Sequence, residues 1–303
     1  MHEALRPLSE VKPLRDPWLI AAFSGFTDQP GAANLAVKTL VDVWGAQPFI
    51  DLDPERFYDF TVQRPRVRLE RGERVLDWPE NRIFIARPEG ASRDILLMTG
   101  VEPHLRWRTF TLAIEDMLRE TGCTTSVTLG AQGSPVPHTR PLPVNLSSSH
   151  PDFETAFGLK APASRYQGQT GIVGVLNLHL RAQGWKNASL WGMSPHYINT
   201  GPNPHVALAQ ISLLDRALGT TTDLTDLREQ GERFDEQVAE VLRESGGDAQ
   251  QYVRQLEEQY DNQRPSLTSG SSDDAPAELP PTGDILDDLE QFLRDQRKGP
   301  DAQ

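Results

Sequence analysis

Cysteine is almost absent from this sequence, which has one, Cys123, among 303 residues. A lone thiol excludes an intrachain disulfide framework and any metal site built from several thiolates. The seven histidines give no metal-binding pattern either, because no two of them are four residues apart. We therefore expect no metal and no cofactor. Cys123 follows Gly122 at the start of an apolar strand, so we expect a buried, inert thiol.

Long hydrophobic runs are also missing. No stretch approaches the roughly 18 uninterrupted apolar residues that a membrane-spanning helix needs. Residues Met1–Arg15 alternate charges, prolines and leucines without the apolar centre of a secretion signal. We expect a cytoplasmic protein that does not enter a membrane.

The chain has no excess of positive charge. Residues 1–222 carry 22 basic and 22 acidic side chains, whereas residues 223–303 carry 8 basic and 21 acidic ones. The formal net charge of −13 therefore lies in the last part of the chain. An acidic segment on a neutral body repels nucleic-acid phosphates and anionic lipids, so we expect neither nucleic acid nor a membrane as a partner.

The first 222 residues alternate strand and helix patterns, which is typical of a wound, three-layer α/β domain. Short apolar runs bounded by Gly or Pro predict strands at Trp18–Gly25, Ala46–Leu52, Arg82–Ala86, Ile95–Thr99, Ser126–Leu129 and Ala188–Trp191. Apolar residues at three- and four-residue spacing predict helices at Pro30–Trp44, Arg106–Glu120, Ile172–Arg181 and Val206–Leu218. Val67–Glu70 and Arg74–Trp78 flank a Gly72 turn and predict a β-hairpin. Four prolines between 135 and 143 predict a loop that extends to His150.

The pattern changes after the 1–222 body. Two charged amphipathic helices, Asp223–Glu244 and Asp248–Asn262, predict an acidic helical hairpin over residues 223–262. Its seam is predicted to pack Leu227, Phe234, Val238 and Val241 against Val253, Leu256 and Tyr260. Residues 263–283, rich in Pro, Ser and Asp, predict a disordered linker. Residues 284–303 predict a terminal amphipathic helix and tail, and we expect Ile285, Leu289 and Phe292 to bind a partner.

Several nucleotide and catalytic motifs are missing, namely G-x-G-x-x-G, the Walker A sequence, H-E-x-x-H and G-x-S-x-G. The turn from Ser24 to Gly31 joins a strand to a helix, which is where open α/β sheets bind ligands. Gly25 and Asp28 in this turn, with Ser134 in a later loop, are the candidate ligand-binding residues. The alternative is that the glycines and Pro30 only form the turn.

Four polar residues after predicted strands are candidates for catalysis: Glu102, His138, Arg140 and His196. If their loops share one sheet edge, they would line a cleft in which a carboxylate, two imidazoles and a guanidinium could transfer protons and hold an anion. The alternatives are structural. Glu102 can cap the helix that begins near Leu105, and histidines between prolines often bond backbone carbonyls.

Five segments carry a family resemblance: WLIAAFSGFTD, MTGVEPHLRW, LGAQGSPVPHTRP, WGMSPHY and GPNPHVAL. Over Trp18–Gly219 the chain resembles the bacterial, actinobacterial-type branch of the proteasome-assembly-chaperone-like proteins. The resemblance implies a fold like that of the phosphorylase/hydrolase-like proteins and oligomerisation, most plausibly as a trimer. It also implies protein binding without catalysis, because the archaeal and eukaryotic relatives bind 20S proteasome α subunits.

Two function hypotheses follow. The first is a non-catalytic protein-binding or assembly protein that forms a homo-oligomer and binds a protein partner, with proteasome subunits as candidates. The alternative is a phosphorylase- or hydrolase-like enzyme with a His/Arg/Glu-lined cleft at the strand C-terminal edge. The placement of the four polar residues distinguishes them, since an enzyme needs their side chains to converge on one open site.

Overall fold

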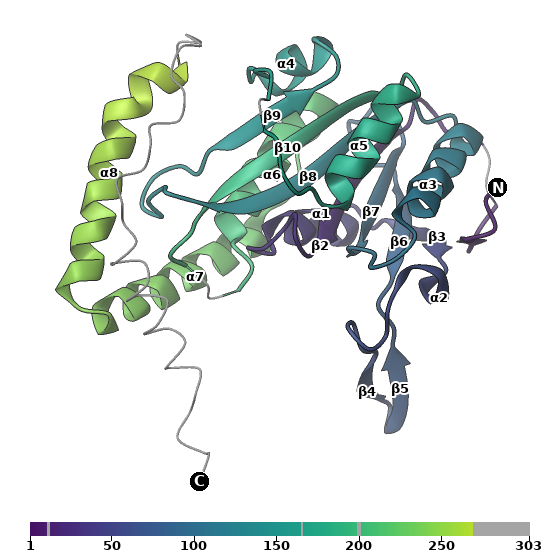
Figure 1. Cartoon of the computed structure of the whole chain (residues 1–303), viewed down its shortest axis with the longest axis horizontal. Coiled ribbons are helices and arrows are strands. Elements are labelled where there is room, and N and C mark those ends of the chain that lie inside the picture. The colour runs from purple at the N-terminus through teal and green to yellow at the C-terminus, as the bar shows by residue number, and fades with distance from the viewer. Residues whose placement is uncertain (11–12, 165, 199–200, 269–303) are drawn as a thin grey trace. The chain divides into compact units, whose positions relative to one another are not determined.

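An eight-stranded mixed sheet forms the centre of the protein in the computed structural model (Figure 1). The structure describes residues 1–10, 13–164, 166–198 and 201–268, with side chains as far as Asn262. In spatial order its strands are β1 (Leu5–Pro7), β3 (Gln47–Leu52), β6 (Asn81–Ala86), β7 (Ile95–Val101), β2 (Trp18–Ser24), β8 (Thr125–Ser134), β10 (Lys186–Pro195) and β9 (Val144–Ser148). The four strands β7, β2, β8 and β10 are parallel, and antiparallel strands flank them on both sides.

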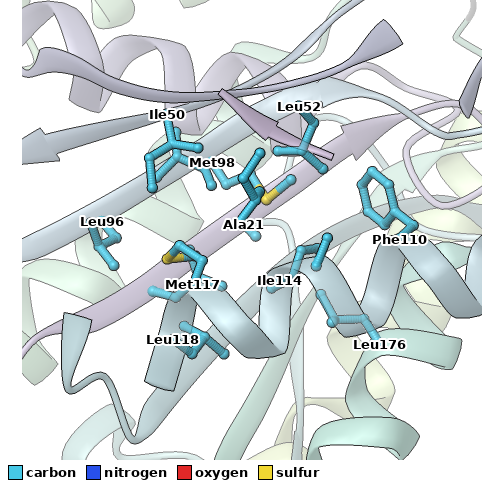
Figure 2. Close-up of a cluster of buried hydrophobic side chains, with 14 of the residues drawn as sticks. Ala21, Ile50, Leu52, Leu96, Met98, Phe110, Ile114, Met117, Leu118 and Leu176 are labelled. Atoms are coloured by element: carbon cyan, nitrogen blue, oxygen red, sulfur yellow. The ribbon is translucent and has the colours of Figure 1, made fainter. Parts of the chain in front are cut away.

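Helices cover both faces of this sheet. The helices α1 (Ala32–Val43), α4 (Asp152–Phe157) and α6 (Pro204–Leu218) pack on one face, and α3 (Trp107–Thr121) and α5 (Ile172–Ala182) on the other. Successive residues of β2 point to opposite faces, so Ile20 packs in the core with α1, α4 and α6, and Ala21 in the core with α3 and α5. Figure 2 shows Ile114 and Met117 of α3 directed at Ala21 and Met98 of the sheet. The prediction of an α/β fold is confirmed.

A two-stranded antiparallel sheet, separate from the main one, lies between β3 and β6 in the chain. It consists of β4 (Arg66–Glu70) and β5 (Glu73–Asp77), joined by a turn in which Arg71 and Gly72 have positive φ angles. The short helix α2 (Pro54–Phe57) precedes it. We call residues 64–78 the arm. The predicted hairpin is confirmed, and Figure 1 shows β4 and β5 standing away from the main sheet.

The predicted loop that extends to His150 is wrong in part. It contains β9, and α4 follows soon after, while β8 and β10 run several residues beyond their predicted ends. The prolines restrict only the segment 135–143, and β9 begins at Val144, immediately after Pro143. Its single antiparallel partner is β10, so as an edge strand it needs few apolar residues and leaves a weak sequence signal.

Two helices follow the body, as predicted: α7 (Thr225–Glu244) and α8 (Gly247–Thr268), the second of which ends beyond the predicted Asn262. They do not form the predicted hairpin seam. Leu227 of α7 joins the core cluster of α1 and α6, and the Phe234 ring lies 6.1 Å from the His205 ring of α6. Figure 1 shows α8 turning away from α7. The apolar stripe of α7 is therefore buried by α6, and Val241 is left 38% exposed.

The rest of the predicted linker, beyond Thr268, lies outside the described residues, as does the predicted terminal helix with Ile285, Leu289 and Phe292. None of the helices in the described part of the chain is long and apolar enough to cross a membrane.

We predict that Phe234→Ala loosens α7 without unfolding the body. Removing a buried aromatic ring should cost about 3 kcal/mol of the packing of α7 on α6. Amide exchange should therefore accelerate across α7 and stay unchanged in β2 and β7. Val241→Ala is the matched control, because a substitution at an exposed position should alter stability by less than about 0.5 kcal/mol. Equal exchange in both variants would contradict the packing described here.

Candidate functional site

The parallel strands bring all the candidate residues to one edge of the sheet. Strands β2, β7, β8 and β10 end at Ser24, Val101, Ser134 and Pro195, and parallel strands place their carboxyl ends at the same edge. The candidates lie in the segments that continue from these ends. What each side chain contacts there decides between the two function hypotheses.

The Glu102 carboxylate caps a helix, though not the expected one. Its oxygens accept hydrogen bonds from the backbone N–H groups of Phe26 (3.1 Å) and Ile172 (2.7 Å), the latter being the first residue of α5. The nearer helix α3 begins only at Trp107. The turn at Gly25 has a φ of 132°, and a Cβ at this position would lie 3.0 Å from the Glu102 Cβ. Gly25 is therefore required by the backbone and by this close approach.

Asp28 caps α1. Its two carboxylate oxygens accept hydrogen bonds from the backbone N–H groups of Ala33 (2.9 Å) and Asn34 (2.8 Å). Burial raises the pKa of Asp28 to about 6, although the two N–H donors act in the opposite direction. These contacts account for both Gly25 and Asp28 without a ligand, as the turn alternative expects.

Ser134 contributes its backbone carbonyl. This oxygen accepts hydrogen bonds from the backbone N–H of His196 (3.1 Å) and from its Nδ1 (2.9 Å). Because a carbonyl can only accept, Nδ1 of His196 carries the proton and Nε2 is free to accept. The hydroxyl of Tyr252 in α8 lies 3.1 Å from Nε2 and donates to it. His196 therefore links the end of β8 to α8.

His138 is bonded to Tyr197. The Tyr197 hydroxyl oxygen accepts a hydrogen bond from the His138 backbone N–H (3.0 Å) and lies 2.7 Å from its Nδ1, to which it donates. Burial lowers the pKa of His138, so that its imidazole is neutral at pH 7, and raises the pKa of Tyr197 to about 12. The rings of His138, Tyr197, His196 and Tyr252 form one edge-to-face cluster with centroid distances of 5.7–6.2 Å.

Arg140 binds α8 through two carboxylates. Its Nε and Nη2 donate to Asp261 (3.0 and 2.8 Å), and its Nη1 lies 3.3 Å from Glu257. The hydroxyl of Thr139 also donates to Glu257, and the hydroxyl of Tyr260 donates to the Pro141 carbonyl (2.7 Å). We call Thr139, Arg140, Pro141 and His196 the α8 clamp.

The structure thus brings His138, Arg140 and His196 to α8 or its immediate surroundings and leaves Glu102 at the start of α5. Each of the four side chains bonds protein backbone or other side chains where it lies, and none of the hydrogen bonds among the described residues joins one candidate side chain to another. Sequence reasoning missed Tyr197, Tyr252, Glu257 and Asp261. The stripe of α8 predicted to face α7 consists of Val253, Leu256 and Tyr260, and of these the Tyr260 hydroxyl donates to the Pro141 carbonyl instead.

No group of three or more His, Cys, Asp or Glu side chains suited to a metal ion occurs among the residues that the structure describes. Cys123 is buried and donates toward the Pro17 and Thr125 carbonyl oxygens (3.2 Å each). Burial raises the pKa of its thiol to about 12, which keeps it protonated and unreactive.

Known proteins share this fold and much of this sequence. The model of the PAC2 family matches residues 22–242, more than half of the chain. A PAC2 family protein from Streptomyces avermitilis is 35% identical, with a TM-score of 0.71 over 78% of this chain and 100% of that one. A proteasome-assembly chaperone homologue from Mycobacterium tuberculosis is 36% identical, with a TM-score of 0.69 over 78% of this chain and 99% of that one. An archaeal proteasome activator from Pyrococcus furiosus shares the fold at 19% identity, with a TM-score of 0.64 over 78% and 97%. No curated protein matches the sequence.

We predict that Arg140→Ala releases the C-terminal part of α8. The variant loses the contacts to Asp261 and Glu257, so amide exchange should accelerate in α8 around these residues. The melting temperature of the body should change little, since the ion pairs are partly exposed and such pairs contribute little to global stability. Arg87→Ala, which removes the ion pair of an exposed guanidinium with the buried Asp94 carboxylate, is the control and should leave α8 unchanged.

We predict a pH dependence that originates from Asp28. Its folded-state pKa of about 6 is above the model-peptide value of 3.8, so the folded state binds its proton more tightly than the unfolded state. Its contribution to stability is full below pH 3.8 and is lost as the pH rises through about 6, by about 3 kcal/mol. Urea unfolding of Asp28→Asn between pH 4 and 7 should lack this decrease. The same slope in the variant and the native protein would show that Asp28 is not its source.

Proposed function

We propose, since this chain belongs to the PAC2 family, that it is a non-catalytic cytoplasmic protein that binds other proteins and assists their assembly. One observation carries this proposal. The polar side chains at the carboxyl edge of the sheet, where an α/β enzyme holds its substrate, are hydrogen-bonded to protein groups instead. Glu102 caps α5, and the other three candidates lie in or beside the contacts that hold α8.

The class of protein partner that we propose is suggested by the related proteins of known structure. One related structure is that of a proteasome-assembly chaperone homologue and another that of a proteasome activator. We therefore propose proteasome subunits as the first protein partners to test. As the resemblance implies, we also propose that the chain forms a homo-oligomer, with a trimer as the expected state.

The body is proposed to follow the phosphorylase/hydrolase-like arrangement without its chemistry. A phosphorylase or hydrolase of this fold would need a base and an anion-binding group facing one substrate. Here the Glu102 carboxylate and the Arg140 guanidinium are bonded to different helices, α5 and α8. The arrangement therefore supports the binding function over the enzymatic alternative.

We predict that the full-length tagged protein retains a specific protein partner from native lysate. Purified 20S proteasome α subunits from the same organism should then co-elute with it on size exclusion and assemble faster in its presence. A buried-core variant that does not fold is the negative control. A purified protein that binds no protein but turns over a phosphate ester or a nucleoside would contradict the proposal.

We predict that the double substitution His138→Ala and Arg140→Ala affects stability rather than turnover. It removes the bond to Tyr197 and the ion pairs to α8, so the loop should loosen and the melting temperature should fall. Any activity that is found should persist in the variant. A loss of activity of more than about a hundredfold at an unchanged melting temperature would favour the enzyme instead.

A further inference from the structure

The arm exposes an apolar face. In its antiparallel register Val67 pairs with Leu76 and Leu69 with Arg74, so these four side chains share one face. Val67 is 62% exposed, Leu69 73% and Leu76 53%. The other face is mostly charged apart from Val75, with Arg68 bonded to Asp77 (2.6 Å) and to Glu70 (3.0 Å).

We expect another protein surface to pack on this apolar face. An isolated two-stranded hairpin is marginally stable in water unless its apolar face packs on something, and no third strand pairs with the arm in the described structure. Grouped exposed apolar side chains on one element are typical of an interaction surface.

The charge of the arm defines the chemistry of its partner. Arg64, Arg66, Arg71 and Arg74 have no ion-pair partner among the residues that the structure describes, and Arg74 lies on the apolar face beside Leu69. The matching surface is therefore apolar at its centre and carries carboxylates at its margin.

One segment of the sequence has this pattern. Asp284–Lys298 is predicted as a helix with Ile285, Leu289 and Phe292 on one face, and its first half contains Asp284, Asp287, Asp288 and Glu290 without a basic residue. Ile285 and Phe292 are two helical turns apart, about 10 Å, whereas Val67 and Leu69 are about 7 Å apart along β4, so the stripe is long enough to cover the apolar face of the arm. A helix of this length is not stable alone in water, so it needs a surface to dock on.

We propose that the arm of one copy binds segment 284–298 of a second copy. Its apolar stripe covers Val67, Leu69 and Leu76, and its acidic first half pairs with Arg71 and Arg74. Because arm and segment are different surfaces, each copy binds one neighbour and is bound by another, which is the head-to-tail contact that closes a ring. This inference rests on the self-association that is part of the proposed function.

A labelled peptide of residues 283–299 tests the contact directly. The receptor is the full-length chain with Phe292→Asp, which disables its own segment. We expect saturable binding by fluorescence anisotropy, weakened about tenfold or more by Leu69→Asp and by the pair Arg71→Glu and Arg74→Glu. Leu178→Asp is the matched control, because this leucine is 65% exposed on α5, away from the arm, and its change should leave binding intact. A peptide with Asp287→Lys and Asp288→Lys should restore binding to the arginine pair variant.

Light scattering of the full-length protein supplies the second measurement. Leu69→Asp and Phe292→Asp should each lower the native mass, and Leu178→Asp should not. Binding that ignores the arm substitutions, no binding at all, or a native protein that is a monomer would each overturn the inference. Capture of a protein partner from lysate by the Leu69→Asp variant distinguishes this inference from the proposed function. If the variant still captures the partner but no longer binds the peptide, the proposed function does not depend on the arm.

Discussion

The burial of β2 on both faces is the constraint on which the rest of the structure depends. Residues Leu19 to Phe23 have no solvent exposure, so helices must cover the sheet on both sides. Parallel strands covered in this way need crossover connections, and every crossover leaves the sheet at the same edge. The polar turn and loop residues of the body therefore gather where β2, β7, β8 and β10 end.

The position of these residues at the ends of the strands has a second consequence, which concerns backbone hydrogen bonding. Helices and strands that end at a covered edge leave backbone N–H and C=O groups that need partners. Asp28 supplies the partner for α1, Glu102 for α5 and Asn203 for α6. In this protein, residue types and positions that suggest catalysis are therefore used to complete the backbone hydrogen bonding of the edge. A carboxylate after a strand is weak evidence for an enzyme until its own bonds are known.

The fold could be predicted from sequence because it depends on local patterns. The apolar runs of β2 and β7, the periodicity of α3 and the Gly72 turn each specify an element within a few residues. The site could not be predicted, because it depends on pairs far apart in the chain. Arg140 and Asp261, or His196 and Tyr252, meet only once α8 is placed. The periodicity of α7 correctly predicted the burial of Leu227, Phe234 and Val238, although Val241 is exposed. Periodicity does not identify the surface that buries the stripe, which is α6 rather than α8. β9 was missed because an edge strand with one partner needs little apolar character.

The contacts become more polar and more exposed from the body to the C-terminal helices. The sheet is sealed by apolar side chains, and α7 is held by Leu227 and Phe234. The contacts of α8 combine the buried side chains of Val253 and Leu256 with the hydroxyls and partly exposed ion pairs of the clamp. Apolar burial sets the free energy needed to open a segment, since exposed ion pairs add little to it. Opening should therefore be easiest at α8, and the groups that its departure frees are the Arg140 guanidinium, the His196 Nε2 and the Pro141 carbonyl. In the structure these groups take carboxylates and hydroxyls of α8 as their partners, so the polar end of the edge is completed by a helix that comes late in the chain.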